Sequence, residues 1–143
     1  TVRRIPATIE AKETVNERGR FMNTDVFGSV TAGCCRCTID CRDQLLSVRL
    51  SGEIDQAGAA VLREKIDQAA ESCLPQTLML DFSGVTFMDS SGIGLVMGRY
   101  RMMKTMDGEL LVTGASPRVK RLMQMGGLDK LPIFGGSVRP EKA

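Results

Sequence analysis

Apolar and polar residues follow two different periods along this chain, and from residue 45 onward these periods predict a regular succession of strands and helices. Leu46, Val48 and Leu50 alternate with polar residues, which is typical of a strand with one buried face. In residues 57–72 the apolar positions lie at helical spacing, and the charged residues, Asp67 among them, are expected on the outer face. The same reasoning predicts further strands at residues 36–41, 77–82, 109–113 and 131–134, and further helices at residues 91–106 and 117–125.

This succession of strands and helices favours an α/β domain. It predicts a single mixed, largely parallel sheet of four to five strands packed with helices. We expect this domain to occupy residues 37–143. Residues 1–36 show no sustained period and are expected to form an N-terminal extension that is flexible.

The junction between the strand at 77–82 and the following helix carries the main candidate site. It reads Asp89-Ser90-Ser91-Gly92, and the first amides of a helix lack partners within the helix. Asp and Ser side chains cap such amides, and the same position favours a phosphate group. Asp55 is the predicted cap of the helix at 57–72. Because the carboxyl ends of parallel strands meet at one edge of a sheet, both junctions are expected to lie at the same edge.

Composition excludes several classes of function. The chain has 143 residues, no His and a net charge of +2. The missing His excludes His-based triads and imidazole acid–base chemistry, and the small net charge gives no indication of a nucleic-acid or membrane partner. No apolar run is long enough to span a membrane and no secretory signal opens the chain, so a cytoplasmic location is expected.

The five cysteines are an odd number for a protein expected in the cytoplasm, so no structural disulfide is predicted. Cys34, Cys35, Cys37 and Cys41 lack the paired C-x2-C spacing of structural zinc sites. Metal binding and redox sensitivity stay open for this cluster, and an incidental origin is the simplest interpretation. We expect neither a metal nor a cofactor.

Other chemistry at the Ser90 junction is less well supported. Residues 91–94 resemble a phosphate-binding glycine loop but lack the Lys of a P-loop and the third Gly of a dinucleotide-binding motif. Asp81 and Asp89 as paired acid–base carboxylates are a weaker interpretation than turn and cap residues. A hydrolase or transferase with Ser90 as nucleophile would lack an evident base, because neither His nor Lys lies near the motif.

Four segments in a fixed order resemble the STAS-domain anti-sigma factor antagonists, most of all those that antagonise the sporulation anti-sigma F factor. The segments are Arg49-Leu50-Ser51-Gly52-Glu53-Ile54-Asp55, Phe87-Met88-Asp89-Ser90-Ser91-Gly92-Ile93-Gly94, Gly98-Arg99-Tyr100 and Ser116-Pro117-Arg118-Val119-Lys120-Arg121-Leu122. The resemblance covers roughly residues 37–134 and implies a STAS fold with no enzymatic activity.

The resemblance also implies a regulatory cycle. An anti-sigma factor that is itself a serine kinase phosphorylates Ser90, and a serine phosphatase of the PP2C type removes the phosphate. The unphosphorylated protein binds the kinase and frees the sigma factor. The residues that this places on the partner-binding surface are Asp55, Asp89, Ser90, Ser91, Gly92 and Ile93. A STAS scaffold or adaptor in a stress-signalling complex is the alternative, and it would not require the serine.

Overall fold

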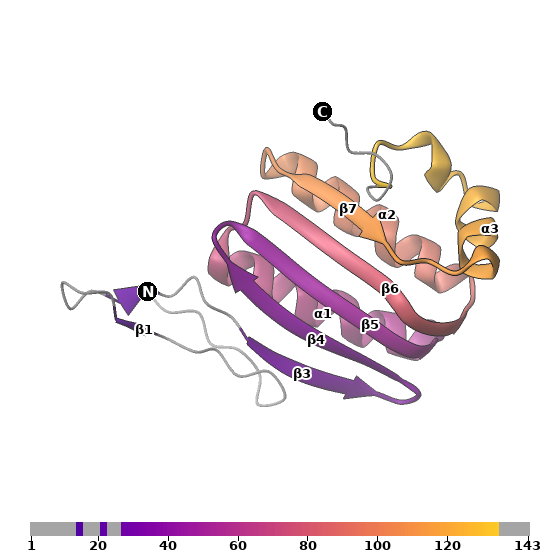
Figure 1. Ribbon diagram of the computed structural model, residues 1–143, viewed down its shortest axis with the longest axis horizontal. Coiled ribbons are helices and arrows are strands. Elements are labelled where there is room, and N and C mark those ends of the chain that lie inside the picture. The colour runs from indigo at the N-terminus through magenta and orange to yellow at the C-terminus, as the bar shows by residue number, and fades with distance from the viewer. Residues whose placement is uncertain (1–13, 16–20, 23–26, 135–143) are drawn as a thin grey trace.

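The computed structural model describes residues 14–15, 21–22 and 27–134, and its centre is one five-stranded sheet (Figure 1). The strands follow each other in the order β3 (Phe27–Ala32), β4 (Cys35–Arg42), β5 (Leu45–Ile54), β6 (Thr77–Met88) and β7 (Glu109–Thr113). The β3–β4 and β4–β5 pairs are antiparallel, and the β5–β6 and β6–β7 pairs are parallel. The prediction of a mixed α/β sheet is therefore confirmed. A separate antiparallel pair joins β1 (Thr14–Val15) to β2 (Phe21–Met22).

Helices cover one face of the five-stranded sheet. Helix α1 (Gln56–Cys73) packs against β3, β4 and β5, and α2 (Ser90–Thr105) packs against β6 and β7 (Figure 1). Helix α3 (Pro117–Met125) and the short 3-10 helix η1 (Leu128–Lys130) follow β7. None of the helices in these described parts is long and apolar enough to cross a membrane.

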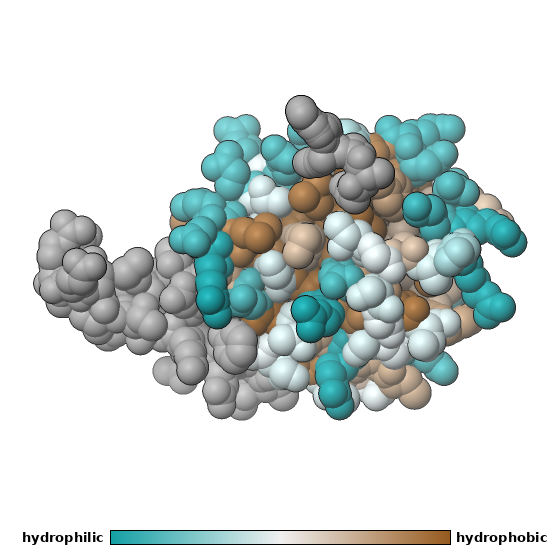
Figure 2. Space-filling model, viewed as in Figure 1, coloured by the Kyte–Doolittle hydropathy of each residue, from teal (hydrophilic) through white to brown (hydrophobic). Residues whose placement is uncertain are grey.

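The alternation of apolar residues predicts the buried face of the sheet correctly. Leu46, Val48 and Leu50 of β5 are fully buried. In β6 the near-continuous apolar run at residues 78–82 indicates a strand buried on both faces, and this is wrong, because Leu80 and Phe82 are fully buried but Met79 is only half-buried. Each fully buried side chain contributes about 1.5–3 kcal/mol when it leaves water. The opposite face of the sheet is open, and Figure 2 shows hydrophilic and intermediate side chains spread across it, with some apolar ones between them. The helix-facing side of the sheet therefore carries the core.

The first strand of the sheet lies in the stretch that we expected to precede the domain. β3 begins at Phe27, whereas the predicted boundary stands at residue 37. Of its described side chains only Val30 is fully buried, and Gly28 interrupts the apolar pattern. An edge strand with so little apolar surface leaves no period-2 signal in the sequence.

The prediction of a last strand at residues 131–134 is wrong. The structure has only an isolated parallel bridge there, between Val112 and Phe134, after the turn that follows η1. Pro132 lacks the backbone N–H that a strand needs for its ladder, which explains why the pairing does not extend.

The prediction of no structural disulfide is also wrong, because Cys41 of β4 and Cys73 of α1 form one. These residues are 32 positions apart and both are buried, at the end of β4 and at the last residue of α1. Sequence spacing does not reveal that their side chains meet. Cys37 stays free, and burial raises the pKa of its thiol to about 12, with the neighbouring Cys35 as the next cause. Within the described residues no three His, Cys, Asp or Glu side chains are arranged to hold a metal ion.

Candidate functional site

Two strand–helix junctions lie side by side at one edge of the sheet. Ile54, the last residue of β5, is paired in register with Met88, the last residue of β6. The next residue in each case, Asp55 or Asp89, caps the following helix. The backbone N–H of Asp89 donates to the carbonyl oxygen of Ile54 at 3.2 Å. The expectation that both junctions share an edge is therefore confirmed.

The Asp55 junction is closed by its own carboxylate. The Oδ1 atom of Asp55 accepts from the backbone N–H of Gly58 at 2.8 Å, and the residue is exposed. Gly58 is buried, and a Cβ atom there would come within 2.8 Å of the Cys35 Sγ atom. Burial, with a smaller contribution from the negative charge of Asp55, raises the pKa of the Cys35 thiol. This thiol therefore packs under the cap in its neutral form.

At the second junction the Asp89 carboxylate holds Ser91. Its Oδ1 atom accepts from the backbone N–H of Ser91 at 2.8 Å and also from the Ser91 hydroxyl. Asp89 and Ser91 are both half-buried. The carboxylate therefore caps α2 and fixes the second of the two adjacent serines.

Ser90 is the first residue of α2 and is exposed. Within the described part of the chain, its side chain makes no hydrogen bond. The hydroxyl stands at the N-terminal end of a 16-residue helix, where the helix dipole favours negative charge. Chemically, Ser90 is a free hydroxyl at a position that can hold a phosphate.

The last two predicted site residues pack against other parts of the chain. A Cβ atom on Gly92 would lie 2.3 Å from the side chain of Met88, so this position must stay without a side chain for α2 to approach the end of β6. Ile93 is half-buried and lies against Gly126 at the end of α3, where an added Cβ would be 2.7 Å from Ile93 Cγ2. Ile93 therefore links α2 to α3.

Sequence reasoning missed two exposed apolar residues near these positions. Phe87 lies two residues before Asp89 and is 46% exposed, and Met125 precedes Gly126 and is 77% exposed. Periodicity assigns an apolar residue at the end of a strand or helix to the core whether or not it is buried. The sequence pattern therefore does not distinguish Phe87 and Met125 from buried apolar residues. They place apolar surface close to the predicted site residues.

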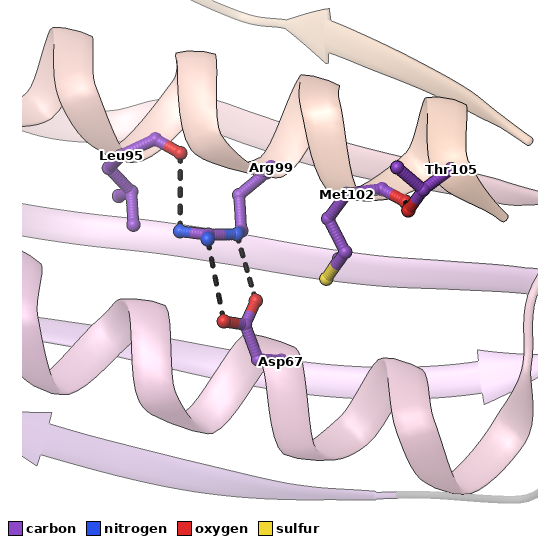
Figure 3. A network of polar contacts seen from close by, with 5 residues as sticks. All are labelled: Asp67, Leu95, Arg99, Met102 and Thr105. Atoms are coloured by element: carbon purple, nitrogen blue, oxygen red, sulfur yellow. Dashed lines mark hydrogen bonds and ion pairs between the residues drawn. The ribbon is translucent and has the colours of Figure 1, made fainter.

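A buried ion pair holds α2 against α1 (Figure 3). Arg99 is only 6% exposed, and its Nε atom lies 2.9 Å from Asp67 Oδ1. The Nη2 atom donates to Asp67 Oδ2 at 3.4 Å, and Nη1 donates to the carbonyl oxygen of Leu95 at 3.4 Å. Burial lowers the pKa of Arg99 and raises the pKa of Asp67, and in each case the charge of the partner offsets part of the shift. The expectation that Asp67 lies on the outer face of its helix is only partly correct, because its carboxylate points to α2.

The open face of the sheet carries a shallow hollow of about 330 Å³ between β4, β5 and β6. It contains the guanidinium of Arg49 and the carboxylates of Asp40 and Asp81, and Arg49 Nε lies 3.8 Å from Asp81 Oδ2. Asp40 also accepts from Arg42 Nε at 3.2 Å, so each of these carboxylates already has a guanidinium partner. Asp81 also accepts from the backbone N–H of Ser83. It lies within the extended strand β6, eight residues before Asp89, so the two carboxylates are too far apart to act as an acid–base pair.

The last part of β5, just before the Asp55 junction, depends on a glycine, where the register with β6 is irregular. Gly52 has φ +87°, and a Cβ atom there would lie 2.1 Å from the carbonyl oxygen of Cys34, which accepts from the N–H of Glu53. We expect Gly52→Ala to lower the free energy of unfolding by at least about 2 kcal/mol, from backbone strain plus this clash. Urea denaturation measures it.

Gly33→Ala is the matched control, because Gly33 also has a positive φ, +61°, but nothing lies within 4 Å of its Cβ position. We expect this control to cost about 1 kcal/mol from backbone conformation alone. Equal losses in the two variants would show that the contact with Cys34 does not matter.

Comparison with known proteins agrees with this architecture. The STAS domain family matches residues 36–140. The chain is 38% identical over 95 residues to the anti-sigma F factor antagonist of Paenibacillus polymyxa. The aligned segment covers 66% of this chain and 81% of that protein.

Two solved structures extend the comparison to the fold. The unphosphorylated form of the anti-sigma factor antagonist SpoIIAA superposes with a TM-score of 0.61 and 32% identity, over 66% of this chain and 83% of that one. The phosphorylated form of SpoIIAA, a Bacillus cell fate determinant, gives a TM-score of 0.56 and 30% identity, over 66% and 86%. By sequence and by fold, the chain belongs to the STAS domain family.

Proposed function

We propose that this protein is an anti-sigma factor antagonist that is switched off by phosphorylation of Ser90. The observation that carries the proposal is the Ser90 hydroxyl, which is exposed at the start of α2 without a hydrogen bond in the described structure. The Paenibacillus relative is named as an antagonist of the anti-sigma F factor, and SpoIIAA has been solved with and without phosphate. Both facts support the same role for this chain.

In the proposed cycle the unphosphorylated protein binds an anti-sigma factor that is also a serine kinase, and the bound sigma factor is released. The contact surface is formed by the edge with Asp55, Asp89, Ser90, Ser91 and the first turn of α2. The kinase then phosphorylates Ser90, the complex dissociates, and a serine phosphatase of the PP2C type restores the starting state. All of these steps take place in the cytoplasm and need neither nucleic acid nor membrane.

The phosphoryl transfer itself balances with ATP as the donor. The Ser90 oxygen forms a bond to the γ-phosphorus, the bond from that phosphorus to the β,γ-bridging oxygen breaks, and ADP leaves with the electron pair. The hydroxyl proton passes to a base of the kinase, since the chain has no His and Asp89 is engaged with Ser91. The protein is therefore a substrate and a binding partner, and not an enzyme.

Phosphate at this position is compatible with the fold. It adds about −1.5 to −2 charge at a helix N-terminus, which stabilises negative charge. The same charge stands beside Asp89 and close to Asp55, so the edge of the sheet becomes strongly negative. A partner that binds the neutral serine loses that contact and meets repulsion instead.

The test is an intact-mass measurement after incubation with ATP and the anti-sigma F factor of Paenibacillus polymyxa, with the relative from that organism as positive control. We expect one phosphate on the wild-type protein and none on Ser90→Ala. The proposal fails for this partner if the Paenibacillus relative is phosphorylated but the wild-type protein is not, and if the wild-type protein also does not bind the anti-sigma factor. Binding without phosphorylation would instead favour the alternative, a STAS scaffold or adaptor in a stress-signalling complex.

A further inference from the structure

Two hydroxyls stand next to each other at the start of α2, and the structure treats them differently. Ser90 is exposed and its hydroxyl has no partner in the described residues. Ser91 is half-buried, and both its N–H and its hydroxyl donate to the same carboxylate oxygen of Asp89. The difference between the two serines therefore depends on one side chain that precedes them both.

We propose that Asp89 is a specificity-determining residue, which directs phosphorylation to Ser90 by holding the hydroxyl of Ser91. This inference rests on the proposed function, since it concerns the site that the kinase modifies. It goes further because it assigns the choice between the two serines to a contact within this protein, and not to the kinase alone.

The physical reason lies in what the transfer step requires. The attacking oxygen must reach the γ-phosphorus of ATP in line with the leaving group, and its proton must be free to pass to a base of the kinase. Ser91 meets these requirements less well, because its hydroxyl donates its proton to Asp89 and the residue is half-buried. A hydrogen bond from a hydroxyl to a carboxylate is stronger than one between neutral groups, so releasing Ser91 has a cost that Ser90 does not have.

The free energy needed to break the hydrogen bond between Ser91 and Asp89 sets the preference of the kinase for Ser90. For a hydrogen bond to a charged group, this free energy favours phosphorylation of the unbound hydroxyl by about tenfold to a hundredfold. Most of the phosphate is thus expected on Ser90 in the wild-type protein, with at most about one tenth as much on Ser91.

The first arm of the test uses three variants, the anti-sigma F factor of Paenibacillus polymyxa with ATP, and phosphopeptide mapping by mass spectrometry. Ser90→Ala alone should remain unmodified. Combined with Asp89→Ala, it should gain phosphate on Ser91 at least about ten times faster than the single variant. The matched control combines Ser90→Ala with Asp89→Asn, whose amide oxygen still caps the helix and still accepts from Ser91. Because the bond to a neutral amide is weaker than the bond to a carboxylate, this control should gain phosphate on Ser91 more slowly than the Asp89→Ala combination and no more slowly than Ser90→Ala.

The second arm needs no kinase and decides the matter where the Asp89→Ala background weakens kinase binding. In isotope-labelled wild-type protein, nuclear magnetic resonance should detect a slowly exchanging hydroxyl proton on Ser91 and none on Ser90. The Ser91 signal should vanish in Asp89→Ala and persist in Asp89→Asn. Circular dichroism confirms that both variants are folded.

Several results would overturn the inference. They are as much phosphate on Ser91 as on Ser90 of the wild-type protein, equal reactivity of the Ala and Asn combinations while both bind the kinase, or fast exchange of both hydroxyl protons. The proposed function can fail separately: if the wild-type protein is never phosphorylated but the Ser91 proton is protected and lost in Asp89→Ala, the contact exists and the kinase assignment is wrong. If Ser90 is phosphorylated and the Ser91 proton exchanges as fast as that of Ser90, the function stands and the role of Asp89 is rejected.

Discussion

Replacing Asp67 with alanine is expected to lower the free energy of unfolding by about 2–3 kcal/mol. The variant leaves the Arg99 guanidinium, whose side chain is 7% exposed, without its carboxylate between α1 and α2. Removal of one partner of a fully buried pair costs somewhat more, and we reduce the figure because the Asp67 side chain is 34% exposed. Urea denaturation followed by circular dichroism measures the loss.

The matched control removes both charges. Asp67→Leu combined with Arg99→Met keeps similar volumes, and we expect the double variant to be at least as stable as the wild type at pH 7. The reason is that burial shifts the pKa of both groups against their charged forms, so the pair costs more in desolvation than its attraction returns. A double variant that is less stable than the wild type would show that the pair contributes net stability.

The pH dependence of this comparison has a definite sign. The pKa of Asp67 is raised in the folded protein above its ordinary value of 3.8, so the folded state binds the proton more tightly than the unfolded state. The stability linked to Asp67 is fully present below pH 3.8 and is lost as the pH rises through the folded pKa. The wild type should therefore gain stability relative to the double variant as the pH falls from 7 towards 4. A difference that moves the other way would contradict the assignment of the shift to burial.

Phosphorylation of Ser90 is expected to lower the affinity for the anti-sigma factor by at least about a hundredfold. The phosphate replaces a free hydroxyl by a group with about −1.5 to −2 charge, directly beside Asp89 and at the same edge as Asp55. Isothermal titration calorimetry with enzymatically phosphorylated protein and the Paenibacillus anti-sigma F factor measures the change. The loss should be smaller at about 300 mM than at about 50 mM salt, because salt screens exposed charges.

Two controls separate this electrostatic effect from unfolding. Ser90→Ala removes the hydroxyl without adding charge and should bind within about threefold of the wild type. The phosphorylated protein should melt within about 2 °C of the unmodified one, since the helix N-terminus accommodates the charge. Unchanged affinity of the phosphorylated protein would refute the switch, and a large drop in melting temperature would assign the effect to the fold.

The sequence predicted those elements whose signal is local. Helices α1 and α3 begin after their predicted caps, as at Ser116-Pro117, where Ser116 Oγ accepts from Val119 N–H. Helix α2 begins at Ser90, one residue before its predicted start, with Asp89 as its cap. The buried row of β5 follows from strict alternation. The shared edge of Asp55 and Asp89 follows from the order of strands and helices, because parallel neighbours end on the same side.

Contacts between distant positions could not be predicted in this way. Asp67 and Arg99 are 32 residues apart, and helical periodicity alone assigns Asp67 to the solvent side. Cys41 and Cys73 pair because the end of β4 lies under the end of α1, which no spacing rule encodes. The hydrogen bond between Asp89 and Ser91 is local, but the sequence equally allows Ser90 or Ser91 as the bonded residue. Only the dihedral angles of the cap decide between them.

The backbone hydrogen bond from Asp89 to Ile54 has an evolutionary consequence. Because main-chain pairing of β5 and β6 sets the distance between the two acidic caps, that distance does not depend on which side chains surround them. Exposed residues near this edge, such as Phe87 and Met125, can be substituted without changing the negative charge of the two caps. Substitutions around this edge can therefore change which partner the surface fits while the spacing of the two acidic caps stays the same.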